Sequence, residues 1–261
     1  MAASSSYVRR VRRPLKSRTG TFARRYGATY TPKTYNRSRA APRAVVYRTS
    51  GELKGVDTSL ALSPVTSTTN TNDSMFVLNL VQQGAGSWNR VGRKLSLYSL
   101  RLTGALQFNS SPGATTGNVT DSLCRMVVVF DKQPSGQSVP KFDDIFGITV
   151  QAGTESSTIV APLRYDNTDR FRVLRDRIFQ GNTDFFNSAG GTTDQIRQQI
   201  PFDEFIKLGL KETVFSGQSD PMTIADISSG ALYVYFRAFN NSTETYFDVS
   251  AQSLARLRYR D

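Results

Sequence analysis

Strand-length apolar segments separated by polar loops constrain the fold of this chain more than any other feature. Residues 122–130 (SLCRMVVVF) and 231–239 (ALYVYFRAF) are near-continuous apolar runs with the length of a buried strand. Further segments of this kind lie at residues 75–81, 93–108, 148–160, 170–181, 205–215 and 244–261. Loops rich in Ser, Asn, Gly and Pro separate these segments, and none of the segments has a convincing helical period. About eight strands without a long helix predict an all-β sandwich or barrel.

Three local patterns predict details of this fold. Leucines alternate within residues 93–108, but the alternation changes phase near Tyr98 and Ser99, which predicts a β-bulge or a bend. Residues 141–147 (KFDDIFG) predict one helical turn. In the last segment, residues 244–261, two-residue alternation places one set of side chains on the core face of the strand and a second set on the opposite face. The core set is Phe247, Val249, Ala251, Ala255, Leu257 and Tyr259, and the opposite set is Asp248, Gln252, Arg256, Arg258 and Arg260.

Positive charge is concentrated at the N-terminal end. Residues 1–48 contain eleven Arg and two Lys without any Asp or Glu, whereas the whole chain has 33 basic and 21 acidic residues. The remainder is therefore almost neutral, which predicts a basic arm (residues 1–48) and a separate folded body (residues 49–261). The arm is rich in Arg, Ser, Thr, Pro and Gly, so we expect it to be disordered on its own.

No apolar stretch has the length of a membrane span, and we expect a soluble protein without membrane insertion.

The arm has the composition of a phosphate-binding segment. Each Lys or Arg that approaches a phosphate releases condensed counterions, and six aromatic residues interleaved with the cations can stack on unpaired bases. We therefore expect it to bind single-stranded nucleic acid. The candidate contacts are Arg9, Arg10, Arg12, Arg13, Lys16, Arg18, Arg24, Arg25, Lys33, Arg37, Arg39, Arg43 and Arg48. Arg9, Arg10, Arg12, Arg13 and Lys16 also form a nuclear-localisation type of run, and basic tails of this kind can alternatively bind rRNA or anionic membranes.

The sequence favours a protein without catalytic activity. It contains no His, which removes the commonest general base and the usual catalytic triads. Cys124, the single cysteine, lies in an apolar run and is expected to be a buried structural thiol. Asp143, Asp144, Asp166 and Asp169 are acidic enough for Mg²⁺ or Ca²⁺, but we expect them to cap helices and form turns. We predict no catalytic residue, no metal and no cofactor, with a metal-dependent nuclease as the alternative.

Five segments in order resemble the coat proteins of geminivirus-like, circular, Rep-encoding single-stranded DNA viruses. They are NRVGRKLSLYSLRLTG (89–104), RMVVVFDKQPSG (125–136), DDIFG (143–147), FRVLRDRIF (171–179) and ALYVYFRAFNNST (231–243). The resemblance extends over most of the body and implies an eight-stranded jelly-roll capsid domain behind a disordered basic arm. Many such coat proteins carry Cys and His in their N-terminal halves. This chain has none there, so a zinc role is not carried over.

The resemblance also implies partners and a location. It implies a homo-oligomer that closes an icosahedral shell, of about sixty copies in the simplest case, around a single-stranded DNA genome. It further implies a virion protein that enters the host nucleus through import receptors and meets a cell receptor or vector of unknown identity. Arg256, Arg258 and Arg260 become candidates for the inner face of such a shell. Residues 109–121 and 180–194 are expected to be exposed or contact loops. The alternative is a non-assembling nuclear shuttle or movement protein that binds single-stranded nucleic acid.

Overall fold

The computed structural model describes residues 52–65, 75–110, 122–134, 138–149, 155–156, 158–181, 197–217, 220–221, 223–239 and 245–261. These residues lie within one compact unit, residues 50–261. The basic arm with its thirteen cations lies outside the described residues, as does most of the two loops predicted at 109–121 and 180–194.

Most of the described residues lie in β-strands, as the sequence predicts. The strands are β1 (Leu53–Ser59), β2 (Leu62–Val65), β3 (Met75–Val77), β4 (Lys94–Ser110), β5 (Ser122–Asp131), β6 (Ile148–Thr149), β7 (Glu155–Ser156), β8 (Phe171–Gly181), β9 (Arg197–Phe215), β10 (Ile227–Ser229), β11 (Ala231–Phe239), β12 (Thr245–Val249) and β13 (Leu254–Arg260). The helical segments are α1 (Phe142–Ile145), η3 (Tyr165–Asn167) and η4 (Ile224–Asp226).

The chain pairs with itself as one long antiparallel hairpin. The strand formed by β1 and β2 pairs with the strand formed by β13 and β12. Moving inward along the sequence, β3 pairs with β11, β4 with β9, and β5 with β8. The innermost pair is joined by a long connection that contains α1, β6, β7 and η3.

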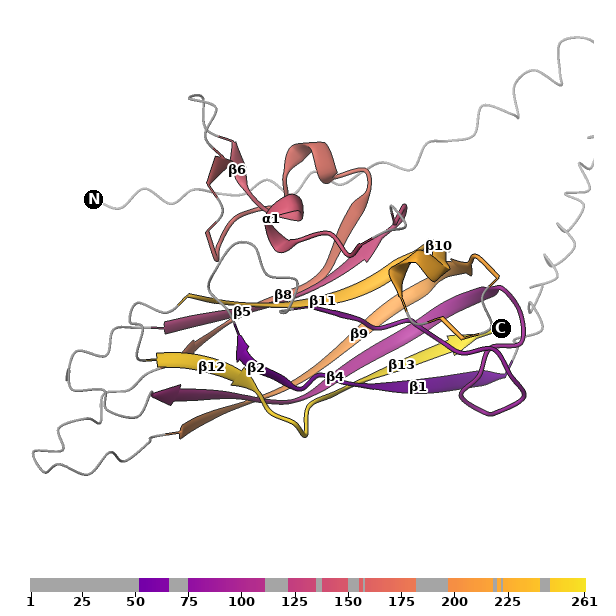
Figure 1. Cartoon of the computed structure of the whole chain (residues 1–261), viewed down its shortest axis with the longest axis horizontal. Helices are drawn as coiled ribbons and strands as arrows, with labels where there is room; N and C mark the ends of the chain where they lie inside the picture. Colours follow the sequence, from indigo (N-terminus) through magenta and orange to yellow (C-terminus); the bar gives the residue numbers. More distant parts are fainter. Residues whose placement is uncertain are drawn as a thin grey trace, which may run out of the picture. The chain divides into compact units, whose positions relative to one another are not determined.

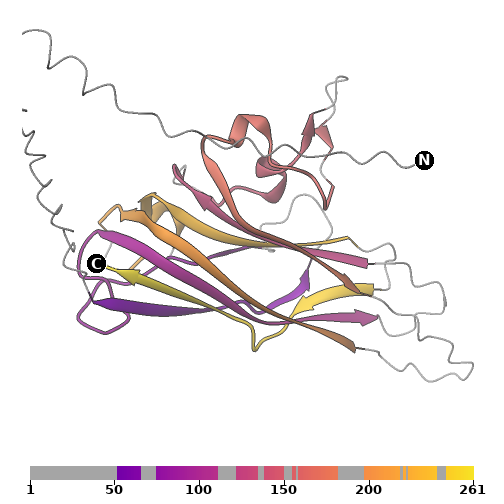
Figure 2. The same ribbon diagram turned by 180° about the vertical axis from the view of Figure 1, so that it is seen from behind.

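Further pairing rolls this hairpin into two packed sheets. β4 also pairs with β12 and β13, and β11 also pairs with β5. One sheet therefore runs β1/β2, β12/β13, β4, β9, with β10 added to β9, and the other runs β3, β11, β5, β8. The two views in Figure 1 and Figure 2 show these sheets as two facing layers. This is the strand order of a jelly roll, so the predicted all-β sandwich of the jelly-roll type is confirmed.

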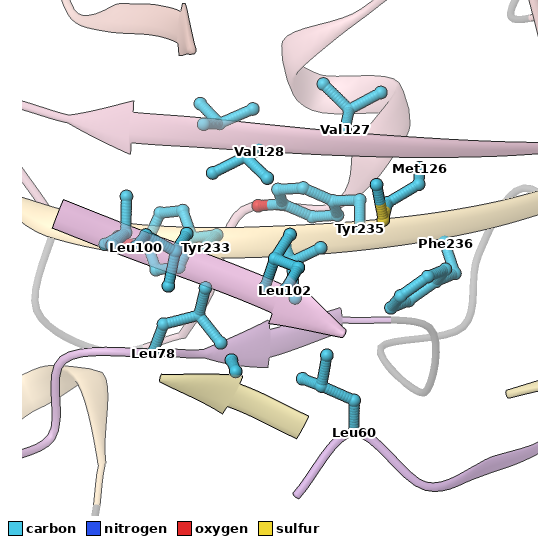
Figure 3. Packing of buried hydrophobic residues seen from close by; sticks show 14 of the residues in the cluster. Leu60, Leu78, Leu100, Leu102, Met126, Val127, Val128, Tyr233, Tyr235 and Phe236 are labelled. Carbon is cyan, nitrogen blue, oxygen red and sulfur yellow. The ribbon is translucent and has the colours of Figure 1, made fainter. Parts of the chain in front are cut away.

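The hydrophobic core fills the space between the two sheets. Figure 3 shows Leu100 and Leu102 of β4 in the same cluster as Val128 of β5 and Phe236 of β11. All four side chains are fully or almost fully buried. Because the sheets are antiparallel and pleated, alternate residues of β4 and β13 face this core, which is what the leucine and Ala255–Leu257–Tyr259 alternations predict.

The predicted bulge at Tyr98 is confirmed. The pairing of β4 with β13 skips Tyr98, because Ser99 lies opposite Arg258 and Leu97 lies opposite Tyr259. Against β9 the irregularity is larger, since residues 208–210 stand opposite Tyr98. The extra residue in β4 restores the alternation of buried leucines on both sides of the bulge.

Several predicted boundaries are wrong by a few residues. Strand β9 begins at Arg197 rather than Phe205, so it continues through Pro201. At Pro201, β9 pairs with β4 alone among the described strands, and the edge of a sheet tolerates proline. β3 ends at Val77 instead of Val81, and the segment at 148–160 contains only the short β6 and β7. Ala251 was predicted to face the core, but it is exposed in the turn between β12 and β13.

The connection between β5 and β8, residues 132–170, covers the outer face of the second sheet (Figure 1). We call it the insertion. Its helix α1 forms the single turn predicted at 141–147, and Phe142 and Phe146 stack with their ring centroids 4.7 Å apart. The hydroxyl of Tyr235 on β11 donates a 2.8 Å hydrogen bond to the carbonyl of Pro140. Both faces of β5 and β11 are therefore packed against other parts of the chain.

Arg125 of β5 anchors this insertion. Its Nη1 donates to the carbonyls of Ile159 and Ala161 at 2.8 and 2.7 Å, and its Nε and Nη2 bond both oxygens of Asp176 on β8. The guanidinium also lies 4.9 Å from the ring centroid of Phe146. The side chain of Arg125 is 6% exposed and that of Asp176 is 41% exposed. The guanidinium of Arg125 is therefore almost fully shielded from solvent, and these partners replace its hydration.

We expect Arg125→Leu to lower the free energy of unfolding by about 3 kcal/mol, because two buried carbonyls and a carboxylate lose their donor. Urea unfolding of the unassembled protein followed by tryptophan fluorescence measures this change. The matched control is Arg101→Leu, which removes a bidentate pair with Asp203 at the exposed surface and should change stability little. Equal effects of the two substitutions would contradict the anchoring role.

Candidate nucleic-acid interface

The outer face of the first sheet carries the cations predicted on the last strand. Ala255, Leu257 and Tyr259 of β13 are buried, so the residues between them point away from the core. Register places Arg256 beside Asp57 of β1 and Arg101 of β4. We define the cationic face as the outward side of β1, β13, β4 and β9 that carries Arg101, Lys207, Arg256, Arg258 and Arg260.

Two of these cations are held by carboxylates on neighbouring strands. Arg256 binds both oxygens of Asp57 at 2.8 Å, and Arg101 binds those of Asp203 at 2.9 and 2.7 Å. These hydrogen bonds lower the pKa of Asp57 and of Asp203, so both carboxylates stay ionised at neutral pH. A phosphate that approaches Arg256 or Arg101 must therefore compete with an intramolecular partner.

The other cations of this face are placed differently. Among the described residues, neither Arg258 nor Lys207 forms an ion pair. The guanidinium of Arg260 lies 5.4 Å from the ring centroid of Tyr98, whose side chain is 44% exposed at the bulge. Phe205 of β9 lies opposite Arg101 and is 58% exposed. Exposed aromatic rings beside cations are the combination that binds unpaired bases by stacking and phosphates by charge.

The sequence pattern predicts the β13 part of the cationic face but not the parts on β4 and β9. Arg101 and Tyr98 lie on β4, and Lys207 and Phe205 lie on β9. In residues 202–208 (FDEFIKL) the charged Glu204 is buried and the apolar Phe205 is exposed, which obscures the two-residue alternation that would identify the outward side of β9. Phe202, Ile206 and Leu208 are buried while Phe205 and Lys207 are exposed. The structure thus joins Arg256, Arg258 and Arg260 to a wider surface.

The residues considered for catalysis occupy structural positions. Burial raises the pKa of the Cys124 thiol, which opposes thiolate formation. Asp144 accepts a 3.0 Å hydrogen bond from the backbone N–H of Lys141 and so caps α1, as predicted. Asp143 does not cap; it lies 3.7 Å from the guanidinium of Arg237.

Within the described ranges, no group of three or more Cys, Asp or Glu residues is placed to hold a metal ion. No helix in the part of the chain that the structure describes is long and apolar enough to cross a bilayer.

Comparison with solved structures gives weak similarity. The chain of the T13 IBDV viral particle matches at 11% identity and a TM-score of 0.29, covering 81% of this chain and 32% of that one. A chain of infectious bursal disease virus Gt strain matches at 11% identity and a TM-score of 0.17, covering 81% of this chain and 41% of that one. The chain therefore spans less than half the length of these two structures. No curated protein matches it.

Comparison with protein families gives a match over nearly the whole chain. The Geminivirus coat protein/nuclear export factor BR1 family matches residues 3–258, which include nearly all of the basic arm and all of the jelly roll except the last two residues of β13. This agrees with the resemblance carried by the five sequence segments. The chain belongs to the Geminivirus coat protein/nuclear export factor BR1 family.

Proposed function

We propose that this protein is a structural capsid subunit that assembles into an icosahedral shell and packages circular single-stranded DNA. The family's described roles are structural and transport roles rather than catalytic ones. The observation that carries the proposal is the division of charge: thirteen cations without a carboxylate precede an almost neutral body. An arm of that charge binds phosphates wherever they are presented, and a jelly-roll body can supply the contacts between subunits.

The proposal assigns a task to each part of the chain. Residues 1–48 contact the DNA, residues 49–261 form the shell, and the cationic face lines its interior with Arg256, Arg258 and Arg260. With about sixty subunits, the arms neutralise roughly 800 phosphates, so a larger genome also needs counterions and interior side chains. The run at residues 9–16 would bind host import receptors before assembly, so the protein would enter the host nucleus and later form the virion.

A non-assembling nuclear shuttle is the second candidate, because the family includes a nuclear export factor. Negative-stain electron microscopy of the purified full-length protein separates the two functions. Closed shells whose nucleic-acid content is single-stranded DNA support the capsid, and only small oligomers support the shuttle. DNA cleavage that requires a metal ion and is lost in Asp143→Asn or Asp166→Asn would instead revive a nuclease.

Deletion of residues 1–43 should leave a folded body that has lost most of its affinity for single-stranded DNA. Each lost phosphate contact lowers the slope of log K against log salt by about 0.7, so the slope should fall steeply. Fluorescence anisotropy with a labelled oligothymidylate over a salt series measures it. As a control, replacing the six arm aromatics by Leu retains the charge and should preserve the slope while weakening binding. Full salt-sensitive affinity in the deletion protein would contradict the proposal.

Asp57→Asn/Asp203→Asn should raise the affinity for single-stranded DNA several-fold, because it releases Arg256 and Arg101 to bind phosphates. The salt slope should steepen by up to about 0.7 for each released cation. Asp166→Asn/Asp169→Asn, which likewise removes two negative charges but from exposed positions on the insertion, is the matched control and should have little effect. If the double variant binds like the wild type, the cationic face does not contact DNA.

A further inference from the structure

The open side of the sandwich, where β8 and β9 are the edge strands of their sheets, has two differently charged parts. In its middle, Glu204 of β9 forms ion pairs with Arg175 and Arg177 of β8. The side chain of Glu204 is 2% exposed, so this carboxylate is buried between the two arginines. Each of these two arginines therefore has an internal carboxylate partner, although the single carboxylate offsets only one of the two positive charges.

A cavity of about 460 Å³ lies further along the same side. Its wall includes Lys132, Arg172 and Lys211, together with the ring of Phe130 and the backbone of Gly209 and Gly230. Glu212 also lines it, but forms no ion pair with the three cations. The cavity thus has a net positive wall, and its three cations differ from Arg175 and Arg177 in having no carboxylate paired with them among the described residues.

Neutral carbonyls, rather than carboxylates, hold two of these cations. The Nζ of Lys211 donates to the carbonyl of Leu208 at 2.9 Å, and the Nζ of Lys132 donates to that of Asp169 at 2.7 Å. Arg172 has no ion-pair partner among the described residues. Burial and the charge of Arg172 both lower the pKa of Lys211. Two like charges therefore face one cavity without an ion-paired carboxylate among the described residues, and an anion bound between them would relieve their repulsion.

Lys211 lines this cavity because strand β9 is irregular. Residues four apart in a regular strand share a face, yet Lys207 points outward while Lys211 approaches the ring of Phe130, with Nζ 5.8 Å from the centroid. The reversal comes from the bulge, where Gly209 and Leu210 have φ of 65° and 57°. Leucine rarely adopts this left-handed conformation, and strain of this kind is concentrated at functional sites.

The cavity also lies at the end of the body where the arm begins. Leu53, Arg260, Ser96 and Glu212 are successive neighbours across β1, β13, β4 and β9. Three strand spacings, about 14 Å, therefore separate the start of β1 from Glu212. Figure 1 shows the C-terminus, the start of β1 and the end of β9 at this same end.

We propose that the cavity between Lys132, Arg172 and Lys211 binds a backbone phosphate of the packaged single strand. This inference rests on the proposed function and adds a fixed phosphate site in the body to the contacts of the arm. A guanidinium and two ammonium groups supply the donors, and their positive charge favours a phosphate over an uncharged base.

The test compares Arg172→Gln/Lys211→Met with wild type in the full-length protein, using anisotropy of a labelled oligothymidylate over a salt series. Loss of two phosphate contacts should lower the slope of log K against log salt by about 1.4. Arg172→Lys/Lys211→Arg, which retains both charges, and Lys141→Gln on the far side of the insertion should retain the wild-type slope. Arg172→Gln alone, an exposed change, should lower it by about 0.7 if the double variant does not fold.

Inorganic phosphate is the second probe. It should raise the melting temperature of the wild type and leave that of the double variant unchanged. A wild-type slope in both Arg172→Gln/Lys211→Met and Arg172→Gln overturns the phosphate site while leaving the proposed function intact. Failure of the wild type to bind oligothymidylate overturns the proposed function itself. Normal DNA binding by the variants with weakened shells would assign the cavity to a carboxylate of a neighbouring copy, and so overturn the inference.

Discussion

Burial of β5 and β11 on both faces is the constraint on which the rest of the body depends. One face of these strands packs against β4 through residues such as Val128 and Phe236, while Val127 and Tyr235 point to the other side (Figure 3). Without a cover, the second face would expose a large apolar surface to water. The insertion between β5 and β8 provides that cover, so it is part of the core. Arg125 is tolerated in the middle of β5 because this cover supplies its acceptors.

The positions of the carboxylates determine which cations can bind a ligand. Buried Glu204 and partly exposed Asp176 form ion pairs with arginines that hold elements together. Asp57 and Asp203 neutralise cations at the surface, where a competing anion can displace them. A body with almost no net charge can therefore contain strongly positive sites. Net charge identifies the arm as a partner for phosphates, but only the pairing of strands shows where the body offers unneutralised cations.

Much of the fold could be predicted because its signals are local. The apolar runs at 122–130 and 231–239, the phase change at Tyr98 and the turn at 141–147 each depend on neighbours in sequence. The extent of β9 could not be predicted, because Pro201 breaks the strand pattern unless the strand is known to lie at an edge. The site was only partly predictable for the same reason: alternation gives the outward side of β13, but not which strand lies beside it.

The bulge opposite Tyr98 shows how a single irregularity can produce two binding surfaces from one strand. Before it, β9 presents Phe205 and Lys207 on the cationic face. After it, the same strand turns Lys211 toward Phe130 and Arg172 on the open side. A regular strand would place both lysines on one face and remove Lys211 from the cavity wall. The left-handed Gly209 and Leu210 are therefore the physical link between the outer sheet surface and the cavity, since they let β9 contribute cations to both.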